Sequence, residues 1–271
     1  MDRQTEITTP GALLNEKGDL ARPGFSRALV QEYRRADVKV SPLRIKEWDY
    51  YLVNNGKFAL ALTVADNGYM GLDSVSLLDL EEGWEITKSP MSFLPLGKKH
   101  LPETSVTGDV HSAARGYGIH FIHEGEKRVL IAYMNKFGES ALSARVELTE
   151  CPEDSLVIAT PFDKPGHFYY NQKIVGFRAS GDVNYNGKTY TFEPSDSFAV
   201  LDWGRGVWTY ENTWYWSSAA YVLPSGTPFG WNLGYGFGDT SAASENMLFH
   251  AGTAHKLGGI KFEIPGEAEG K

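Results

Sequence analysis

Three Asn-Gly pairs constrain the fold of this chain more than any other feature of its sequence. They lie at residues 55–56, 67–68 and 186–187, and each is flanked by alternating or apolar-rich stretches. A two-residue hairpin turn of the common type needs a positive φ at both central positions, which Asn and Gly tolerate well. Each pair therefore predicts a β-hairpin, and together they favour an antiparallel all-β fold.

Short strand candidates follow one another along most of the chain, and helices are hard to find. The first four strands are expected at residues 48–54, 57–65, 74–80 and 84–88. Further candidates are residues 119–123, 128–135, 144–150, 155–160, 169–177, 181–185, 189–193, 197–202, 213–222 and 229–237. Such spacing is typical of antiparallel barrels or sandwiches. The helical candidates are residues 26–35 and one turn around residues 241–247.

The sequence Cys151-Pro152-Glu153-Asp154 interrupts this pattern near the middle of the chain. We expect a boundary there between two consecutive β units, since the length allows either one large β domain or two of ordinary size. Residues 1–40 are then an N-terminal segment that packs on both units. Residues 41–150 form the first unit, and residues 151–271 form the second unit, which carries a tryptophan-rich cluster.

Composition excludes several classes of protein. The 271 residues are 42% hydrophobic and 22% charged, which is ordinary for a globular protein with a large core. The net charge of -8 gives no electrostatic footprint for nucleic acid or for an anionic membrane. The chain shows neither a signal peptide nor the roughly 20 apolar residues of a transmembrane segment, so we expect a cytoplasmic protein. A single cysteine, Cys151, excludes an internal disulfide and a multi-thiolate zinc site.

The tryptophan-rich cluster at residues 197–221 is the most unusual stretch. It holds four of the seven tryptophans, together with Asp202 and Arg205. Clustered aromatic side chains either fill a core or line a pocket that binds an apolar or ring-shaped ligand. The candidate ligand-binding residues, from this stretch and nearby, are Arg205, Trp203, Trp208, Trp214, Trp216, Trp231, Tyr235, Asn246 and His167.

Two roles are open for Asp202, which shares a strand face with Phe198 and Val200 in the expected strand. An apolar surrounding raises the pKa of a carboxyl group and lets it act as a general acid near neutral pH. A direct contact with Arg205 would instead hold the carboxylate ionised. In that case the two side chains form a structural pair that ties the strand to its turn.

Residues 231–238 alternate large side chains at the odd positions with Asn or Gly at the even positions. One face of such a strand is a wall of large side chains, and the other is nearly bare backbone. Glycine inside a strand marks a bend or a place where another backbone or a ligand comes close. The strand is therefore either a barrel corner or a floor that leaves room for a ligand.

The segment after this strand holds a second candidate carboxylate, Glu245. One interpretation is a polar loop that closes onto a helical turn capped by Asp239. In the other, Glu245 faces Asp202 across a cavity, and the two act as acid and base for water addition or double-bond migration.

The seven histidines give no clear metal cluster. A spacing of three places His120 and His123 on opposite faces of a strand. Of the others, His167 is the best candidate for a place near a ligand, because aromatic residues 168–170 follow it. We expect no metal and no cofactor.

Several long segments resemble one known family. They include ITTPGALLNEKGDLARPG, RIKEWDYY, HLPETSVTGDVH, VLDWGRGVWTYENTWYWSSA and NLGYGFGDTSAASENMLF. Along the whole chain they resemble the bacterial domain of unknown function 2804 (DUF2804), a resemblance that implies no established reaction. The general style also resembles the carotenoid hydratase and AttH-like proteins, which include hydratases, cyclases and isomerases. That resemblance implies two consecutive lipocalin-like (calycin-like) barrels or sandwiches, and the second one here is expected to be incomplete at its C terminus.

These observations favour a protein that binds an apolar or aromatic small molecule. As an enzyme it would be a cofactor-independent hydratase, isomerase or cyclase that uses the carboxylates of Asp202 and Glu245. Alternatively, it sequesters a lipid or isoprenoid unchanged, or it binds carbohydrate on open aromatic faces. If the protein is an enzyme, we expect an unpaired carboxyl in the cavity. If it is a carrier, we expect the charged groups to be held away from the cavity. The oligomeric state stays open.

Overall fold

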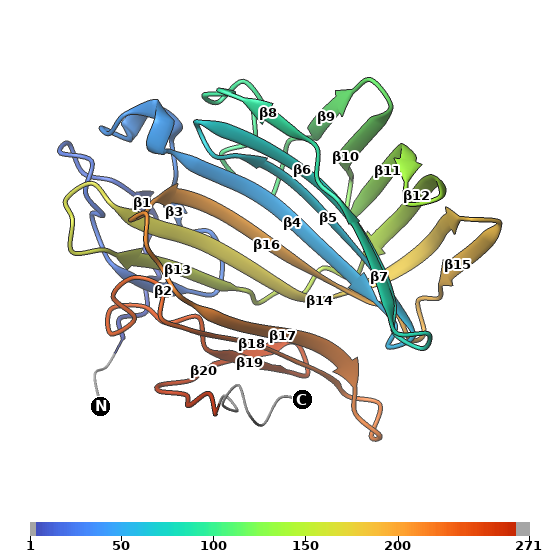
Figure 1. Ribbon diagram of the computed structural model, residues 1–271. Helices are drawn as coiled ribbons and strands as arrows, with labels where there is room; N and C mark the ends of the chain where they lie inside the picture. Colours follow the sequence, from blue (N-terminus) through green and yellow to red (C-terminus); the bar gives the residue numbers. More distant parts are fainter. Residues whose placement is uncertain (1–3, 264–271) are drawn as a thin grey trace.

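A computed structural model describes residues 4–263, and these form an almost entirely β structure (Figure 1). The only helical elements in this range are the 3-10 turns η1 (Arg35–Asp37) and η2 (Pro42–Arg44). The strands form a 14-stranded, a four-stranded and a two-stranded sheet, and all pairs except β1 with β3 in the smallest sheet are antiparallel. The predicted antiparallel all-β fold is confirmed.

The strands up to residue 124 are β1 (Gly11–Ala12), β2 (Gly24–Ser26), β3 (Gln31–Glu32), β4 (Lys46–Asn54), β5 (Phe58–Asp66), β6 (Met70–Asp79), β7 (Trp84–Lys88), β8 (Met91–Phe93), β9 (Val110–Ala114) and β10 (Tyr117–Glu124). The strands after it are β11 (Lys127–Phe137), β12 (Ser140–Thr149), β13 (Leu156–Pro161), β14 (Phe168–Tyr185), β15 (Lys188–Phe192), β16 (Phe198–Val207), β17 (Tyr215–Val222), β18 (Pro228–Tyr235), β19 (Met247–His250) and β20 (Thr253–Lys256).

The three Asn-Gly pairs connect β4 to β5, β5 to β6 and β14 to β15, and each connected pair is antiparallel. At the last turn Asn186 has φ 49° and Gly187 has φ 74°, the left-handed conformation that this type of turn requires. The predicted hairpins are confirmed. Both helix predictions are wrong: β2 and β3 lie within residues 26–35 or at their edge and pair with β13 and β1, and residues 241–247 hold a turn and a bend before β19 begins at Met247.

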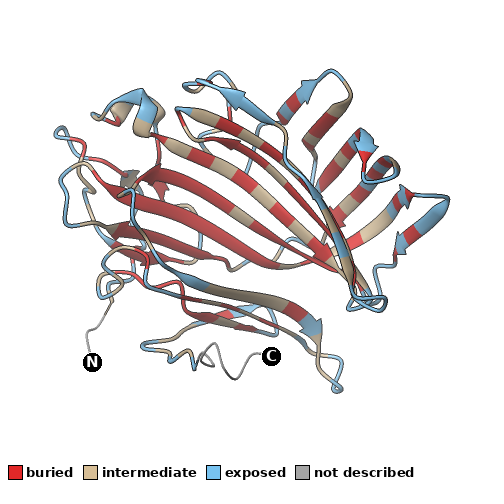
Figure 2. Cartoon of the chain, viewed as in Figure 1, coloured by how far each residue is buried: buried red, intermediate tan, exposed pale blue. Residues whose placement is uncertain are grey.

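The large sheet runs in the order β7-β6-β5-β4-β16-β14-β12-β11-β10-β9 and curls until β10 and β11 approach β5 and β7 (Figure 1). The main hydrophobic core fills the inside of this curl. Strands β14 and β16 lie at the centre of the sheet and are mostly buried (Figure 2). Because both follow residue 151 and pair with β12 and β4, strands from the two expected units build one continuous sheet.

A second core lies on the other face of β13, β14 and β16, under the four-stranded sheet β17-β18-β19-β20 (Figure 1). Successive residues of β16 alternate between the two cores: Leu201 and Trp203 belong to the first, Phe198 and Val200 to the second. The expectation of an incomplete C terminus rests on residues 261–271, most of which lie outside the described range. In the part of the chain that the structure describes, we find no helix with the length and apolar character to cross a lipid bilayer.

Candidate functional site

A cavity of about 280 Å³ lies between the central strands of the large sheet and the four-stranded sheet. Strands β4, β5, β14 and β16 supply one wall. The other comes from β17, the segment between β16 and β17, and the segment after β18. The residues that line it are Trp48, Tyr50, Thr63, Tyr169, Lys173, Asp202, Trp208, Trp214, Trp216, Phe237 and Glu245. Most of these side chains are aromatic. Three others are charged groups: Lys173 is a cation, and Asp202 and Glu245 are carboxylates.

The aromatic wall is packed by ring contacts. The ring of Trp48 stacks on Tyr169, with centroids 5.8 Å apart, and meets Trp208 edge-on at 5.2 Å. Phe237 contacts both Trp208 and Trp214, and Trp214 is 54% exposed, so this end of the cavity reaches solvent. Such rings hold an apolar or ring-shaped ligand by dispersion and stacking without a specific hydrogen bond.

Lys173 on β14 joins the two carboxylates of the cavity. Its Nζ lies 2.6 Å from Asp202 Oδ2 and 3.5 Å from Glu245 Oε2, and 4.9 Å from the ring centre of Trp216. Lys173 and Asp202 are direct register partners on β14 and β16, which explains their contact. The exposed side-chain fractions of Lys173, Glu245 and Asp202 are 3%, 9% and 15%. Two buried carboxylates therefore share one ammonium.

The two carboxylates differ in how firmly they are held. Asp202 Oδ1 accepts a hydrogen bond from Asn171 Nδ2 at 2.7 Å and another from Trp48 Nε1 at 3.2 Å. Glu245 has the longer contact with the ammonium. Burial raises the pKa of the Glu245 carboxyl above its ordinary value, Lys173 opposes this rise, and the nearby charge of Asp202 adds to it. Glu245 is thus the group of the cavity most suited to carry a proton near neutral pH.

The tyrosines of the cavity remain neutral. Burial, with the charge of Asp202 adding to it, raises the pKa of Tyr50 to about 12. Burial also raises the pKa of Tyr169 well above its ordinary value, and the nearby charges of Glu245 and Asp202 raise it further. Both phenols therefore present O–H groups rather than charges to a ligand.

Strand β18 positions Glu245 through its glycines. Gly230, Asn232 and Gly234 are buried and face the interior, whereas the large side chains between them face outward. A Cβ at Gly234 would lie 2.8 Å from Cβ of Glu245, so only glycine lets the carboxylate segment come this close. Asn232 Nδ2 donates to the carbonyl of Glu245 at 2.8 Å. The face of β18 that lacks large side chains therefore leaves space, and the side chain of Glu245 occupies this space.

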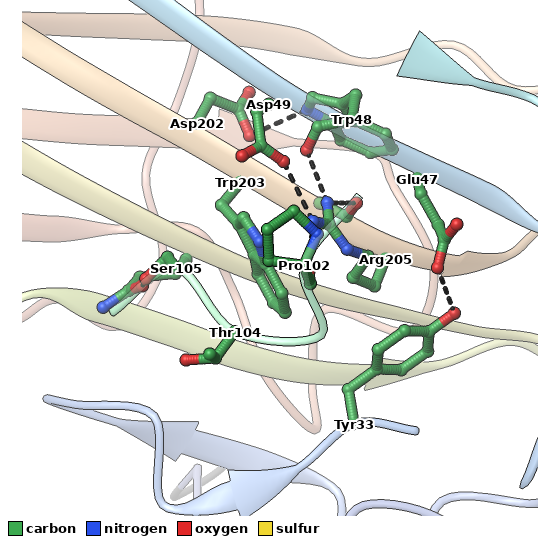
Figure 3. A network of polar contacts seen from close by, with 12 residues as sticks. Tyr33, Glu47, Trp48, Asp49, Pro102, Thr104, Ser105, Asp202, Trp203 and Arg205 are labelled. Carbon is green, nitrogen blue, oxygen red and sulfur yellow. Dashed lines mark hydrogen bonds and ion pairs between the residues drawn. The ribbon is translucent and has the colours of Figure 1, made fainter. Parts of the chain in front are cut away.

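Arg205 does not pair with Asp202, so the structural pair considered as one of the two roles of Asp202 does not form. The two residues are three apart on β16, and side chains at such a spacing point to opposite faces of a strand. Arg205 is fully buried on the first-core side, where it donates to Asp49 Oδ1 at 2.9 Å and to the carbonyl of Pro102 at 2.7 Å (Figure 3). Arg205 and Asp49 therefore form the structural ion pair, and the cation that pairs with Asp202 is Lys173.

Trp203 and Trp231 do not line the cavity either. Trp203 is fully buried in the first core, beneath the guanidinium of Arg205, whose centre lies 4.2 Å from its ring. Trp231 lies on the outer face of β18, and its Nε1 donates to Ser217 Oγ at 3.0 Å. Of the five tryptophans among the candidate ligand-binding residues, Trp208, Trp214 and Trp216 line the cavity.

Three further candidates lie away from the cavity. Tyr235 is 57% exposed on the outer face. Asn246 uses its Oδ1 to accept the backbone N–H of Gly234 at 2.9 Å. His167 is buried with its Nδ1 3.0 Å from the carbonyl of Pro165, and burial lowers its pKa. Among the described residues no group of three or more His, Cys, Asp or Glu could hold a metal ion.

Sequence reasoning missed Trp48, Tyr50 and Lys173. A signal for Lys173 is nevertheless present, because Asn171, Gln172 and Lys173 are polar residues within the otherwise apolar first half of β14. A charged side chain in such a run has to find a partner when it is buried.

A family model described as a domain of unknown function, DUF2804, matches residues 4–269. The chain belongs to the DUF2804 family. It is the same family that the sequence segments resemble. A comparison with curated proteins finds no match.

Among solved structures, this DUF2804 protein is similar to an AttH-like protein from Nitrosomonas europaea, with 13% identity, a TM-score of 0.48, and coverage of 83% of this chain and 71% of the other. Kievitone hydratase from Nectria haematococca has 10% identity and a TM-score of 0.42, with coverage of 90% and 73%. CghA has 12% identity and a TM-score of 0.46, with coverage of 91% and 68%.

Proposed function

We propose that this DUF2804 protein binds an apolar or aromatic small molecule in the cavity and acts on it by acid-base chemistry, as a hydratase, isomerase or cyclase without a cofactor. The observation that carries the proposal is the sharing of the Lys173 ammonium by Asp202 and Glu245 inside an aromatic cavity. One ammonium neutralises one carboxylate, so the most favourable state of the three groups includes one proton on a carboxylate. The raised pKa of Glu245 supports placing that proton on Glu245.

In this mechanism Glu245 gives its proton to a double bond of the substrate. The positive charge that develops next to the new C–H bond faces aromatic rings, whose negative faces stabilise cations. Asp202, ionised beside Lys173, accepts a proton from a neighbouring carbon for double-bond migration, or from a water molecule for hydration. Lys173 holds both carboxylates toward the same point of the cavity.

A non-catalytic carrier is the second candidate, and the contacts of Asp202 favour it, because an enzyme predicts an unpaired carboxyl in the cavity. Asp202 is already bound by Lys173, Asn171 and Trp48, the arrangement of a charge that is held for structure. In that case the aromatic cavity binds the same class of ligand and releases it unchanged.

The test begins with mass spectrometry of small molecules retained by the purified protein. Quenching of tryptophan fluorescence by 1-N-phenylnaphthylamine, an uncharged aromatic probe, reports on the cavity directly. We expect retention of an apolar compound and quenching that is reduced in Trp216→Ala. If neither a retained compound nor quenching is found, the cavity does not bind such molecules.

Turnover of the retained compound then separates the two candidates. The enzyme predicts that Glu245→Gln keeps binding and lowers turnover by about 100-fold or more, the usual contribution of a general acid. Glu147→Gln, a change to a partly exposed carboxylate on β12, is the matched control and should leave both unchanged. Unchanged ligand in the presence of wild-type protein identifies a carrier.

A further inference from the structure

A second, larger cavity of about 840 Å³ lies on the other side of the segment that carries Glu245. Ser244 and Asn246 face this second cavity, while Glu245 between them faces the aromatic one. Its walls mix apolar and hydrogen-bonding groups, including Gln4, Phe25, Tyr235 and Ile260. Lys256 at the end of β20 is the cation that lines it.

Ser244 and Lys256 are directly hydrogen-bonded in this cavity. Lys256 Nζ lies 2.8 Å from Ser244 Oγ, 3.0 Å from the carbonyl of Asn246 and 3.1 Å from the carbonyl of Leu257. Gln4 holds the serine from the other side: its Nε2 donates to Ser244 Oγ at 3.0 Å, and its Oε1 accepts the Ser244 backbone N–H at 2.7 Å. The serine hydroxyl is therefore fixed between an amide and an amine.

Counting protons shows what each form of the amine requires. An ammonium would donate to all three oxygens, and the hydroxyl proton of Ser244 would then need an acceptor outside these contacts. A neutral amine donates to the two carbonyls and uses its lone pair to accept the Ser244 proton. Every donor and acceptor of the group is then paired.

We propose that Ser244 is a nucleophile and Lys256 its general base, forming a serine-lysine dyad for acyl transfer that is separate from the aromatic cavity. The Ser244 oxygen attacks the carbonyl carbon of an ester while its proton moves to Lys256 Nζ. The bond from that carbon to the leaving oxygen breaks, and Lys256 returns the proton to the leaving alcohol. Water then hydrolyses the seryl ester by the same route. Dyads of this kind replace the serine-histidine pair in unrelated folds.

The surroundings of Lys256 support this role. No carboxylate of the described residues lies within ion-pair distance of Lys256 Nζ. Burial lowers the pKa of Lys256 to about 8, against a smaller opposing effect of Glu245, so a substantial fraction is neutral near physiological pH. Thr160 Oγ1 also donates to the carbonyl of Ala243 at 2.9 Å, which fixes the segment before the serine.

Phenylmethylsulfonyl fluoride tests the dyad, because its sulfur forms a bond with an activated serine oxygen, fluoride leaves, and the base takes the proton. We expect intact-mass analysis to show one adduct, and peptide mapping to place it on Ser244. Ser244→Ala should abolish it. Ser241→Ala is the matched control, since Ser241 lines the same cavity, is exposed and donates to Asp239, and it should label at the wild-type rate.

Lys256→Arg separates a base from a structural cation. Arginine keeps the positive charge and the donors but does not accept a proton. A dyad predicts that the labelling rate falls by about 100-fold, the usual contribution of a general base, while the thermal midpoint stays near the wild-type value. If the arginine variant labels like wild type, or if the wild-type protein forms no adduct at Ser244, the dyad is wrong. Labelling of Ser244 requires no ligand or turnover in the aromatic cavity, so this result is independent of the proposed function of that cavity.

Discussion

Replacing Lys173 by methionine tests the charge arrangement of the aromatic cavity. The change keeps most of the side-chain volume but removes the ammonium that Asp202 and Glu245 share. All three side chains are largely buried, and removing one partner of a buried ion pair typically costs about 3–5 kcal/mol. In the variant, Asp202 keeps its hydrogen bonds from Asn171 and Trp48, and Glu245 can take up a proton. We therefore expect the free energy of unfolding to fall by about 3 kcal/mol, the lower end of that range.

The loss depends on pH with a defined sign. Lys173 is the group that opposes the rise in the pKa of Glu245, so in the variant this pKa rises further. A carboxyl whose pKa is higher in the folded than in the unfolded state favours folding as pH falls. The destabilisation of Lys173→Met is therefore largest above the raised pKa and shrinks as pH falls through it toward about 4.3, the unfolded value.

Urea unfolding of wild type and Lys173→Met at pH 8 and pH 5 measures this difference. Lys127→Met is the matched control, because Lys127 also pairs with a carboxylate, Glu147 at 3.0 Å, but half of its side chain is exposed. Such surface pairs contribute about 1 kcal/mol or less. A loss below 1 kcal/mol for Lys173→Met at pH 8, or an equal loss at both pH values, would refute the proposed charge sharing.

Other predictions follow from the same geometry. Gly204→Ala should cost about 1–3 kcal/mol and weaken probe quenching, because a Cβ there would lie 2.1 Å from the Trp48 ring. Arg205→Met should cost about 3–5 kcal/mol in urea unfolding by leaving Asp49 unpaired, yet the folded fraction should quench normally. Tryptophan fluorescence should titrate with a midpoint above about 4.3, the ordinary glutamate value, and Glu245→Gln should remove that transition.

The fold could be predicted from local sequence because residues that are adjacent in the chain specify its turns. Asn186 and Gly187 adopt the conformation that the pair favours, and the strands on both sides then have to run antiparallel. The two helix predictions failed for the opposite reason. The backbone of residues 24–26 is extended because β13 offers it partners 131 to 135 positions further along the chain, a contact that no local pattern contains.

The site could be predicted in part. The period of two places Asp202 on the face of Phe198 and Val200, and the structure agrees. The same period assigns Arg205 and Trp203 to the opposite face, and a stricter use of it would have separated them from Asp202. Lys173 could not be assigned in this way, because its contact with Asp202 depends on the register between β14 and β16.

The two faces of β16 carry two different kinds of buried ion pair. On the first-core face, Arg205 and Asp49 balance each other in charge, and the guanidinium also donates to the carbonyls of Trp48, Gly204 and Pro102 (Figure 3). On the other face, one ammonium meets two carboxylates beside an open cavity. Trp48 joins the two, since its carbonyl accepts from Arg205 while its indole N–H donates to Asp202. In the proposed mechanism, the balanced pair of Arg205 and Asp49 fixes the strand that carries Asp202, and the proton of Glu245 on the other side remains available to a ligand.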